Sequence, residues 1–351
     1  MENAIVFTHN LLGENFAKTA HGLLRGTERF NVVAVIDSLH HGKDAGEVLD
    51  GNRINIPVYK SIKEFIKNSD AKAQCCIVGV AFPGGILPNE CRNELLEGIK
   101  LGFSIISGLH HYLSEDIEFI SAAKDHNVKL VDIRKPRNVS GLHFWTGKIL
   151  NIKTPINAVL GTDCASGKRT MARFILENCI NNGIRAELIY TGQTGWMQGY
   201  KHGFIFDATP NDFVSGELER VILECVDQSD PDLIILEGQS SLQNPSGPGG
   251  SEFILSGNAK SVIIVHPIGR KYFVDLEEFE YEIPDLIDEI KLIESYGANI
   301  IGLGINDENT TEDELIKFKN KYKQLLDIPV VIPLTDGVDD IVKNIKEKLL
   351  L

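Results

Sequence analysis

"GTDCASGKRT", residues 161–170, follows the apolar run "INAVL" at 156–160 and precedes the helix-like stretch "MARFILENCI" at 171–180. A strand, a turn of small residues and a helix in that order are typical of a phosphate-binding loop, or P-loop. Five residues separate the two glycines, Gly161 and Gly167, where the standard P-loop has four. The stretch is therefore a variant P-loop, and it predicts a parallel α/β sheet around it.

The residue types of this loop suit a phosphate or diphosphate. Small residues let successive backbone N–H groups point at an anion, and the helix that begins near Gly167 adds its positive end. Lys168 supplies a full positive charge. We expect the cofactor's phosphates to contact Gly161, Thr162, Ser166, Gly167, Lys168, Arg169 and Thr170.

Arg169 stands where a P-loop NTPase usually carries the hydroxyl that holds magnesium. Thr170 follows one residue later, about 100° further round a helix, and does not replace it. Lys168 and Arg169 together can neutralise a diphosphate without a metal. The pair favours a cofactor that is held but not cleaved at phosphorus, such as coenzyme A, and no metal site is expected.

Composition indicates a water-soluble protein of about two domains, since the chain has 351 residues, 43% of them hydrophobic and 24% charged. No apolar run is long enough to span a bilayer, and no secretory signal is visible. The six cysteines form no CxxC pair, so we expect reduced thiols and a cytoplasmic location. A net charge of −14, all of it carried by residues 151–351, argues against nucleic-acid binding.

Apolar strand-like runs alternate with helix-like segments along the whole chain, which predicts parallel sheets with crossover helices. We expect a Rossmann-like domain at 1–150 and a P-loop NTPase-like domain at 151–351. The expected strands of the first are 4–8, 31–37, 75–81, 103–108 and 129–133. Those of the second are 156–161, 185–192, 232–238, 261–267, 299–306 and 328–334, with helices near 167–181, 215–228, 284–296, 311–326 and 337–350.

The first domain lacks the sequence signature of a dinucleotide site. "THNLLGEN" after its first strand offers one glycine, Gly13, instead of G-x-G-x-x-G. Asp37 ends the second strand, where a ribose-binding acid would lie, but without the glycines a pyrophosphate cannot approach the backbone. We do not expect NAD to bind.

Polar residues that end the strands are the remaining site candidates, because ligands of such sheets bind at the carboxyl ends of strands. Gln193 and Thr194 lie in a glycine-flanked loop after one strand, and Glu237, Gln239, Ser240 and Ser241 follow the next. "EGQSSLQ" lacks the G-x-S-x-G pattern, so a serine nucleophile is not expected. His266 is a general base or a packed strand-end histidine, and His110 and His111 line a cleft or serve as plain loop residues.

The second domain resembles dethiobiotin synthetase through "GTD…GK", the "EG" after its third strand, "GLGIN" and "IPVVIPL". A closer resemblance covers nearly the whole chain. "GTDCASGKRT", "TGQTGWMQG", "LEGQSSLQNP", "GLHHYLSED" and "DIRKP" are similar to a bacterial family that contains D-glutamate N-acetyltransferases.

This second resemblance implies that acetyl-CoA binds with its phosphates at residues 161–170 and that an amino acid's amine attacks the thioester. It leaves Asp163, Glu237 and His266 as candidates for the base. Backbone N–H groups, or Gln193 and Gln239, are candidates for oxyanion donors. The substrate's carboxylates would meet Arg134, Lys135 and Arg137.

Three functions remain open at this point. The first is an N-acetyltransferase acting on a small acidic amino acid, with D-glutamate as the foremost acceptor. The second is an ATP- and magnesium-dependent ligase or kinase of the dethiobiotin synthetase type. The third is a nucleotide- or CoA-binding protein without turnover. We expect a homodimer or a higher homo-oligomer in each case, without nucleic-acid or membrane partners.

Overall fold

The computed structural model describes residues 1–82 and 85–349, which divide into two compact units. The first unit contains residues 1–137 and 192–200, and the second contains 138–191 and 201–351. The boundary expected at residue 150 therefore differs in two places. Residues 138–150 belong to the second unit, and the short segment 192–200 belongs to the first.

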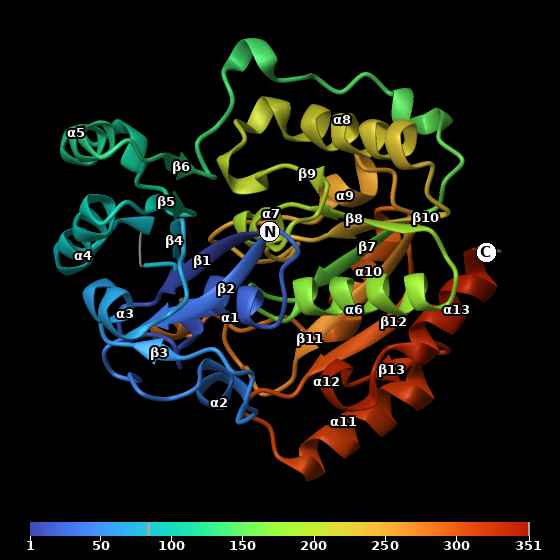
Figure 1. Ribbon diagram of the computed structural model, residues 1–351. Helices are drawn as coiled ribbons and strands as arrows, with labels where there is room; N and C mark the ends of the chain where they lie inside the picture. The colour runs from blue at the N-terminus through green and yellow to red at the C-terminus, as the bar shows by residue number, and fades with distance from the viewer. Residues whose placement is uncertain (83–84, 350–351) are drawn as a thin grey trace. The chain divides into compact units, whose positions relative to one another are not determined.

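The first unit is built on a six-stranded parallel sheet in the order β3-β2-β1-β4-β5-β6. This is the doubly wound order of the Rossmann fold. The strands, blue to cyan-green in Figure 1, are β1 (Glu2–Phe7), β2 (Phe30–Ile36), β3 (Val58–Tyr59), β4 (Cys75–Val78), β5 (Ser104–Ser107) and β6 (Leu130–Asp132). Residues of β1 and β4 are fully buried. These two strands are continuously apolar because a central strand of a parallel sheet is covered on both faces.

Crossover helices connect these strands: α1 (Lys18–Leu24), α2 (Ala45–Asp50), α3 (Ile62–Asn68), α4 (Asn89–Lys100) and α5 (Ile117–Asp125). Short polar side chains begin three of them by accepting hydrogen bonds from first-turn N–H groups. Asp44 begins α2, Ser61 begins α3 and Asp116 begins α5.

The carboxylate of Asp37, which directly follows β2, accepts its hydrogen bonds from other residues of the first unit. Its buried carboxylate accepts hydrogen bonds from Thr8 Oγ1 at 2.8 Å, from the Leu12 N–H at 3.0 Å and from the His40 N–H at 3.1 Å. It therefore joins the loop after β1 to the loop after β2.

The segment 192–200 forms the helix α7 (Gln193–Gln198), where a glycine-flanked loop was expected. Met197 is fully buried in the apolar core of the first unit, and the Arg29 guanidinium lies 4.1 Å from the centre of the Trp196 ring. The Gln198 amide donates a 3.0 Å hydrogen bond to the carbonyl of Gly22. These apolar and polar contacts make α7 part of the first unit, although it lies between two strands of the second in the sequence.

The second unit has a seven-stranded parallel sheet in the order β13-β12-β11-β7-β10-β8-β9. Its strands are β7 (Ile156–Gly161), β8 (Ala186–Tyr190), β9 (His202–Gly203), β10 (Leu233–Glu237), β11 (Ser261–Pro267), β12 (Asn299–Asn306) and β13 (Val330–Val331). β7 lies at the centre, between β10 and β11. The loop that follows it is thus bordered by the carboxyl ends of two other strands.

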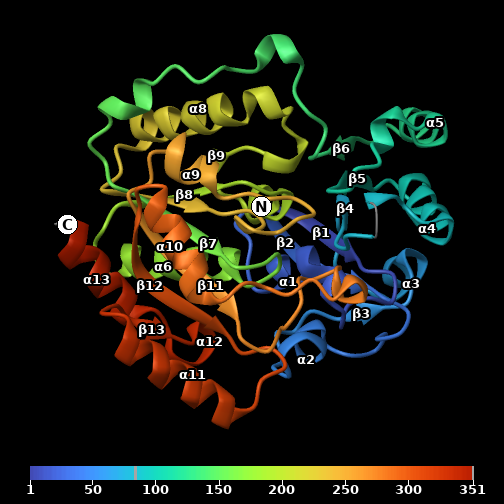
Figure 2. The ribbon, with the colours of Figure 1, turned by 180° about the vertical axis from the view of Figure 1, so that it is seen from behind.

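Helices cover this sheet, and the view of Figure 2 shows α11 and α13, in red, beside β12 and β13. The helices of the second unit are α6 (Lys168–Asn181), α8 (Asn211–Ser229), α9 (Ser251–Leu255), α10 (Leu286–Ser295), α11 (Glu312–Leu325), α12 (Pro333–Asp336) and α13 (Asp339–Leu349). Residues 138–152 run along α8, to which they are held by hydrogen bonds from His143 and Thr146 to the buried Glu217 and Glu219.

The two-domain α/β fold expected from the sequence is confirmed. The long apolar strands β7, β11 and β12 have the expected bounds, whereas the two-residue strands β3 and β9 were not expected. The end of the last helix, expected at residue 350, lies outside the described residues.

No helix among residues 1–82 and 85–349 is both long and apolar enough to cross a membrane.

Candidate functional site

The loop between β7 and α6 has the backbone of a phosphate cradle. Ala165 and Gly167 adopt left-handed conformations, with φ angles of 48° and 102°. Such alternation turns successive N–H groups toward one point and forms an anion-binding concavity. Gly161 has no room for a side chain, because a Cβ there would lie 2.5 Å from Ser166 Oγ and 3.0 Å from the Val265 carbonyl oxygen. The first glycine thus allows close packing, and the second allows the backbone turn into the helix.

Lys168 lies at the start of α6 with its side chain turned back over the loop. Its ammonium donates hydrogen bonds to the carbonyl oxygens of Asp163 at 2.6 Å and of Ser240 at 2.7 Å. Lys168 is 7% exposed, and burial lowers the pKa of its ammonium. This cation therefore lies inside the loop and joins it to the segment that follows β10.

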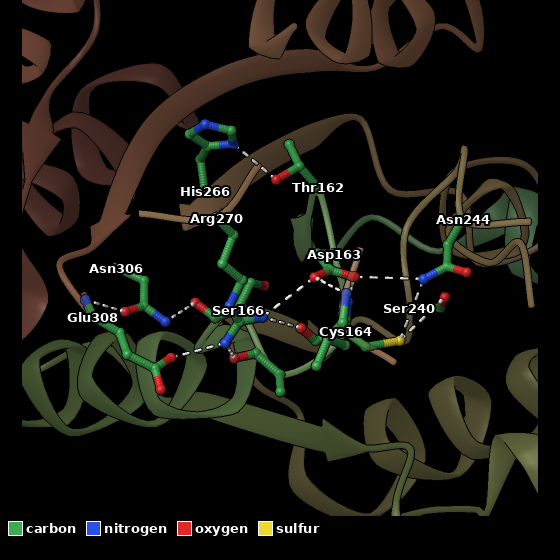
Figure 3. A network of polar contacts seen from close by, with 12 residues as sticks. Thr162, Asp163, Cys164, Ser166, Ser240, Asn244, His266, Arg270, Asn306 and Glu308 are labelled. Carbon is green, nitrogen blue, oxygen red and sulfur yellow. Dashed lines mark hydrogen bonds and ion pairs between the residues drawn. The ribbon is translucent and has the colours of Figure 1, made fainter. Parts of the chain in front are cut away.

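Arg270, which follows β11, is a second cation on the same loop (Figure 3). Its guanidinium donates to the carbonyls of Cys164 at 2.9 Å and of Ala165 at 3.2 Å, and it pairs with Glu308 at 2.8 Å. Asn306, at the end of β12, donates a 3.2 Å hydrogen bond to the Ser166 carbonyl. The carbonyls of three successive loop residues thus have donors from neighbouring strands, which leaves the inner side of the loop to its N–H groups.

Asp163, a candidate base, is fully buried and its carboxylate accepts four hydrogen bonds. The donors are the Cys164 N–H at 2.6 Å, the Asn244 amide at 3.4 Å, Arg270 Nη1 at 3.2 Å and the Val274 N–H at 3.0 Å. A carboxylate in this position holds the loop together, and its lone pairs are occupied.

Glu237, a second candidate, ends β10 and is 5% exposed. Its carboxylate accepts a 3.3 Å hydrogen bond from the Thr191 N–H. Burial raises the pKa of Glu237, while the charges of Arg169 and Lys168 act to lower that pKa. A buried carboxyl with a raised pKa next to the cations of a phosphate loop is well suited to proton transfer.

His266, the third candidate, lies near the end of β11 with its ring stacked on Phe318, the centroids 5.4 Å apart. Its Nδ1 is 2.8 Å from Thr162 Oγ1. Burial lowers the pKa of His266 to about 4, so the ring is neutral at physiological pH. A base of such low pKa is poorly matched to removing a proton from an ammonium group.

The loop that follows β10 carries three further candidates. Gln239 donates a 2.9 Å hydrogen bond to Thr191 Oγ1, and Ser240 accepts the hydrogen bond of Lys168 through its carbonyl. The Ser241 hydroxyl is buried without a hydrogen-bond partner among the described residues. Glu289 of α10 holds the next part of the loop by accepting from the Leu242 N–H at 3.3 Å. The loop is therefore ordered around the phosphate loop by groups from several elements.

The remaining candidates lie in the first unit, at the carboxyl end of its sheet. Arg134, just after β6, donates to the Gly108 carbonyl at 2.6 Å and to Gln193 Oε1 at 2.9 Å. Thr194 Oγ1 is 3.1 Å from Thr19 Oγ1. Arg134 and Gln193 are thus brought together.

The other expected residues of that unit are Lys135, Arg137 and His110. Lys135 is exposed and contacts Ser114 at 3.0 Å and Glu115 at 3.1 Å. Arg137 and His110 are exposed, and the His110 ring lies against Gly85. A role in substrate binding stays a prediction for all of these residues.

Both parts of the chain match known sequence families. Residues 143–342 match the family described as "Domain of unknown function (DUF1611_C) P-loop domain", and residues 38–136 match "Domain of unknown function (DUF1611_N) Rossmann-like domain". The chain belongs to the DUF1611 family. The family and the two domain types expected from the sequence are thereby confirmed.

Relatives of this DUF1611 chain include two proteins named D-glutamate N-acetyltransferase. One, from Pseudoalteromonas sp, is 28% identical over 278 residues, which are 78% of this chain and 81% of the relative. The other, from Tritonibacter scottomollicae, is 26% identical over 279 residues, with the same coverage. The crystal structure of a DUF1611 family protein from Anabaena variabilis has the same fold, with a TM-score of 0.89, 23% identity and coverage of 99% of this chain and 100% of that one.

Arg270, Glu308 and Asn306 were not recognised from the sequence of this DUF1611 chain. Arg270 and Asn306 contact loop residues that precede them by 106 and 140 positions, because β7, β11 and β12 follow one another in the sheet, and Glu308 pairs with Arg270. The available signal was their position directly after strands, which applies to many polar residues.

Proposed function

We propose that the protein is an N-acetyltransferase that moves the acetyl group of acetyl-CoA to the amine of a small acidic amino acid, with D-glutamate as the first candidate acceptor. The observation that carries the proposal is the grouping of Lys168, Arg169 and the buried Glu237 around a phosphate loop. The names of the two curated relatives support the reaction and the acceptor.

Binding of the cofactor is proposed to begin at its diphosphate. The loop offers backbone N–H groups, and Lys168 is already inside it. Arg169 adds a charge at the position where a hydroxyl for magnesium usually lies. Because two cations and the helix terminus can compensate a diphosphate, we expect acetyl-CoA to bind without a divalent metal.

Transfer then requires a free amine, which Glu237 is proposed to provide. The acceptor's ammonium gives a proton to the Glu237 carboxylate, and the amine nitrogen attacks the thioester carbon. The C–N bond forms and the C–S bond breaks, and the departing CoA thiolate takes up the second proton that the amine nitrogen loses as the amide forms. We favour Glu237 over Asp163, whose four hydrogen bonds occupy it, and over His266, whose pKa of about 4 is too low.

The proposal is tested by measuring release of the free CoA thiol from acetyl-CoA with a panel of D- and L-amino acids. Turnover with acidic amino acids that disappears in Glu237→Gln is the expected result. Exposed Glu312→Gln serves as the control and should retain turnover. No thiol release with any amine would contradict the proposal.

Arg134 is proposed to bind an acceptor carboxylate, because guanidinium groups pair well with carboxylates. Arg134→Met should raise the KM for the amino acid and leave the KM for acetyl-CoA unchanged. An unchanged KM for both substrates would remove Arg134 from the proposal.

A further inference from the structure

A cavity of about 340 Å³ opens at the carboxyl ends of β11 and β12. One wall is the segment 268–271, directly after β11, and the other is formed by the segment after β12 and by α11. The lining residues on this second wall are Asn309, Thr310, Glu314 and Phe318. Two of the lining residues contact the site described above: Arg270 donates hydrogen bonds to the phosphate loop, and Phe318 stacks on His266.

This cavity is next to the phosphate loop. β11 lies between β7 and β12 in the sheet, so the loops that follow all three strands share one edge. Arg270 lines the cavity and also donates hydrogen bonds to the carbonyls of Cys164 and Ala165. The Arg270 side chain therefore borders both the cavity and the phosphate loop.

The two walls are fixed against each other. A Cβ on Gly269 would lie 2.3 Å from the Glu308 carbonyl oxygen, so that the two segments pack backbone to backbone. Arg270 pairs with Glu308 at 2.8 Å across the same junction. The cavity is thus part of the fold rather than a chance gap between side chains.

The lining suits a flat heteroaromatic group attached to an anion. Ile268 and Phe318 are apolar, Asn309 and Thr310 offer hydrogen-bonding groups, and Arg270 and Lys271 are cations. A volume of about 340 Å³ is at the lower end of ligand sites, which suits part of a cofactor rather than the whole.

We propose that this cavity binds the adenine nucleoside of the cofactor whose diphosphate occupies the phosphate loop. The inference rests on the proposed function for the diphosphate. CoA and ATP both carry an adenine nucleoside joined to a diphosphate. CoA alone has a further phosphate on the ribose, and we assign its binding to Lys271, a cation that lines the cavity and pairs at 3.0 Å with the exposed Glu282.

The first test fills the cavity and compares ligands of increasing length by calorimetry. Thr310→Phe should weaken binding of CoA and of ADP about tenfold or more, a difference of about 1.4 kcal/mol, and leave inorganic diphosphate within about twofold. Glu312→Phe, which adds the same ring at an exposed position outside the cavity, is the control and should bind CoA nearly as well as the unaltered protein.

Lys168→Ala separates this inference from the proposed function, because it should weaken diphosphate, ADP and CoA alike. If Lys168→Ala behaves in this way and Thr310→Phe leaves the affinities for CoA and ADP unchanged, diphosphate binding by the phosphate loop is supported and nucleoside binding in the cavity is contradicted.

The second test distinguishes the two sources of the nucleoside, CoA and ATP. Lys271→Met should weaken CoA severalfold but not dephospho-CoA or ADP, and an equal effect on all three would contradict the role of Lys271.

Discussion

Arg270 and Asp163, 107 residues apart in the chain, form an ion pair in which Nη1 lies 3.2 Å from Oδ2. Both side chains are largely buried, at 12% and 0% exposure. Because the same guanidinium also binds two carbonyls of the loop, this pair couples the shape of the phosphate loop to the segment that follows β11.

Asp163→Asn should therefore lower the free energy of unfolding. Replacement of a residue that served only as the general base would leave the free energy of unfolding unchanged. The variant removes the buried one of the two carboxylates that pair with Arg270 and leaves only the more exposed Glu308, so we expect a loss of about 2 kcal/mol. Urea unfolding measures this loss, and exposed Asp327→Asn is the matched control in the same unit. Unchanged stability together with a lost kcat would instead make Asp163 the base.

Glu237→Gln should lower kcat about 10²- to 10⁴-fold and leave the affinity for acetyl-CoA intact, because the amide keeps the shape but takes no proton. The pKa of Glu237 is raised by burial, and the ionised form is the active base. The rate should therefore rise with pH through a pKa above the ordinary carboxyl value of 4.5. A pH–rate profile that keeps the same rising limb in the variant would assign that limb to another group.

Gly161→Ala should abolish binding of inorganic diphosphate. The added Cβ would meet Ser166 Oγ at 2.5 Å and the Val265 carbonyl at 3.0 Å, so the loop must move. Gly247→Ala is the matched control, since a Cβ there meets no atom within 4 Å. Equal affinities of the two variants, measured by calorimetry, would show that the loop does not hold the phosphate.

Stability of the first unit should depend on Asp116 in acid. Hydrogen bonds from Arg92 lower the pKa of Asp116 to about 2, from 3.8. The pair thus contributes about 2 kcal/mol above pH 4, which is lost as the pH falls from about 4 to 2. Asp116→Asn should remove this amount at pH 7, as measured by urea unfolding.

Asp50→Asn provides the comparison for Asp116→Asn. It breaks the more exposed pair with Arg25, and we expect a loss below about 1 kcal/mol. Equal losses in the two variants would show that burial of the Arg92 pair adds nothing.

The sequence predicted the fold where local pattern and burial agree. β7, β11 and β12 are long apolar runs because they lie inside a parallel sheet, and the glycines of the loop have steric causes. β3 and β9 have two residues each, too few for any periodicity. α7 was expected as a loop because glycines flank it, and its helix depends on burial of Met197 in a core formed by distant segments.

The site was predictable only in part for the same reason. Lys168 and Glu237 could be recognised from their positions after strands. Arg270, Glu308 and Asn306 act on the loop through long-range contacts that no spacing reveals. The choice of base among Asp163, Glu237 and His266 also depended on burial and hydrogen bonds. The lone pairs of Asp163, for example, are occupied by hydrogen bonds that the sequence does not reveal.

The most direct test of the account is a titration of the protein with acetyl-CoA and with ATP, each with and without magnesium, repeated with Lys168→Ala. We predict that acetyl-CoA binds equally well with and without the metal and that Lys168→Ala weakens this binding at least about tenfold, or 1.4 kcal/mol. Tight binding of ATP that requires magnesium, with no binding of acetyl-CoA, would contradict the proposed acetyltransferase and favour an ATP-dependent ligase or kinase.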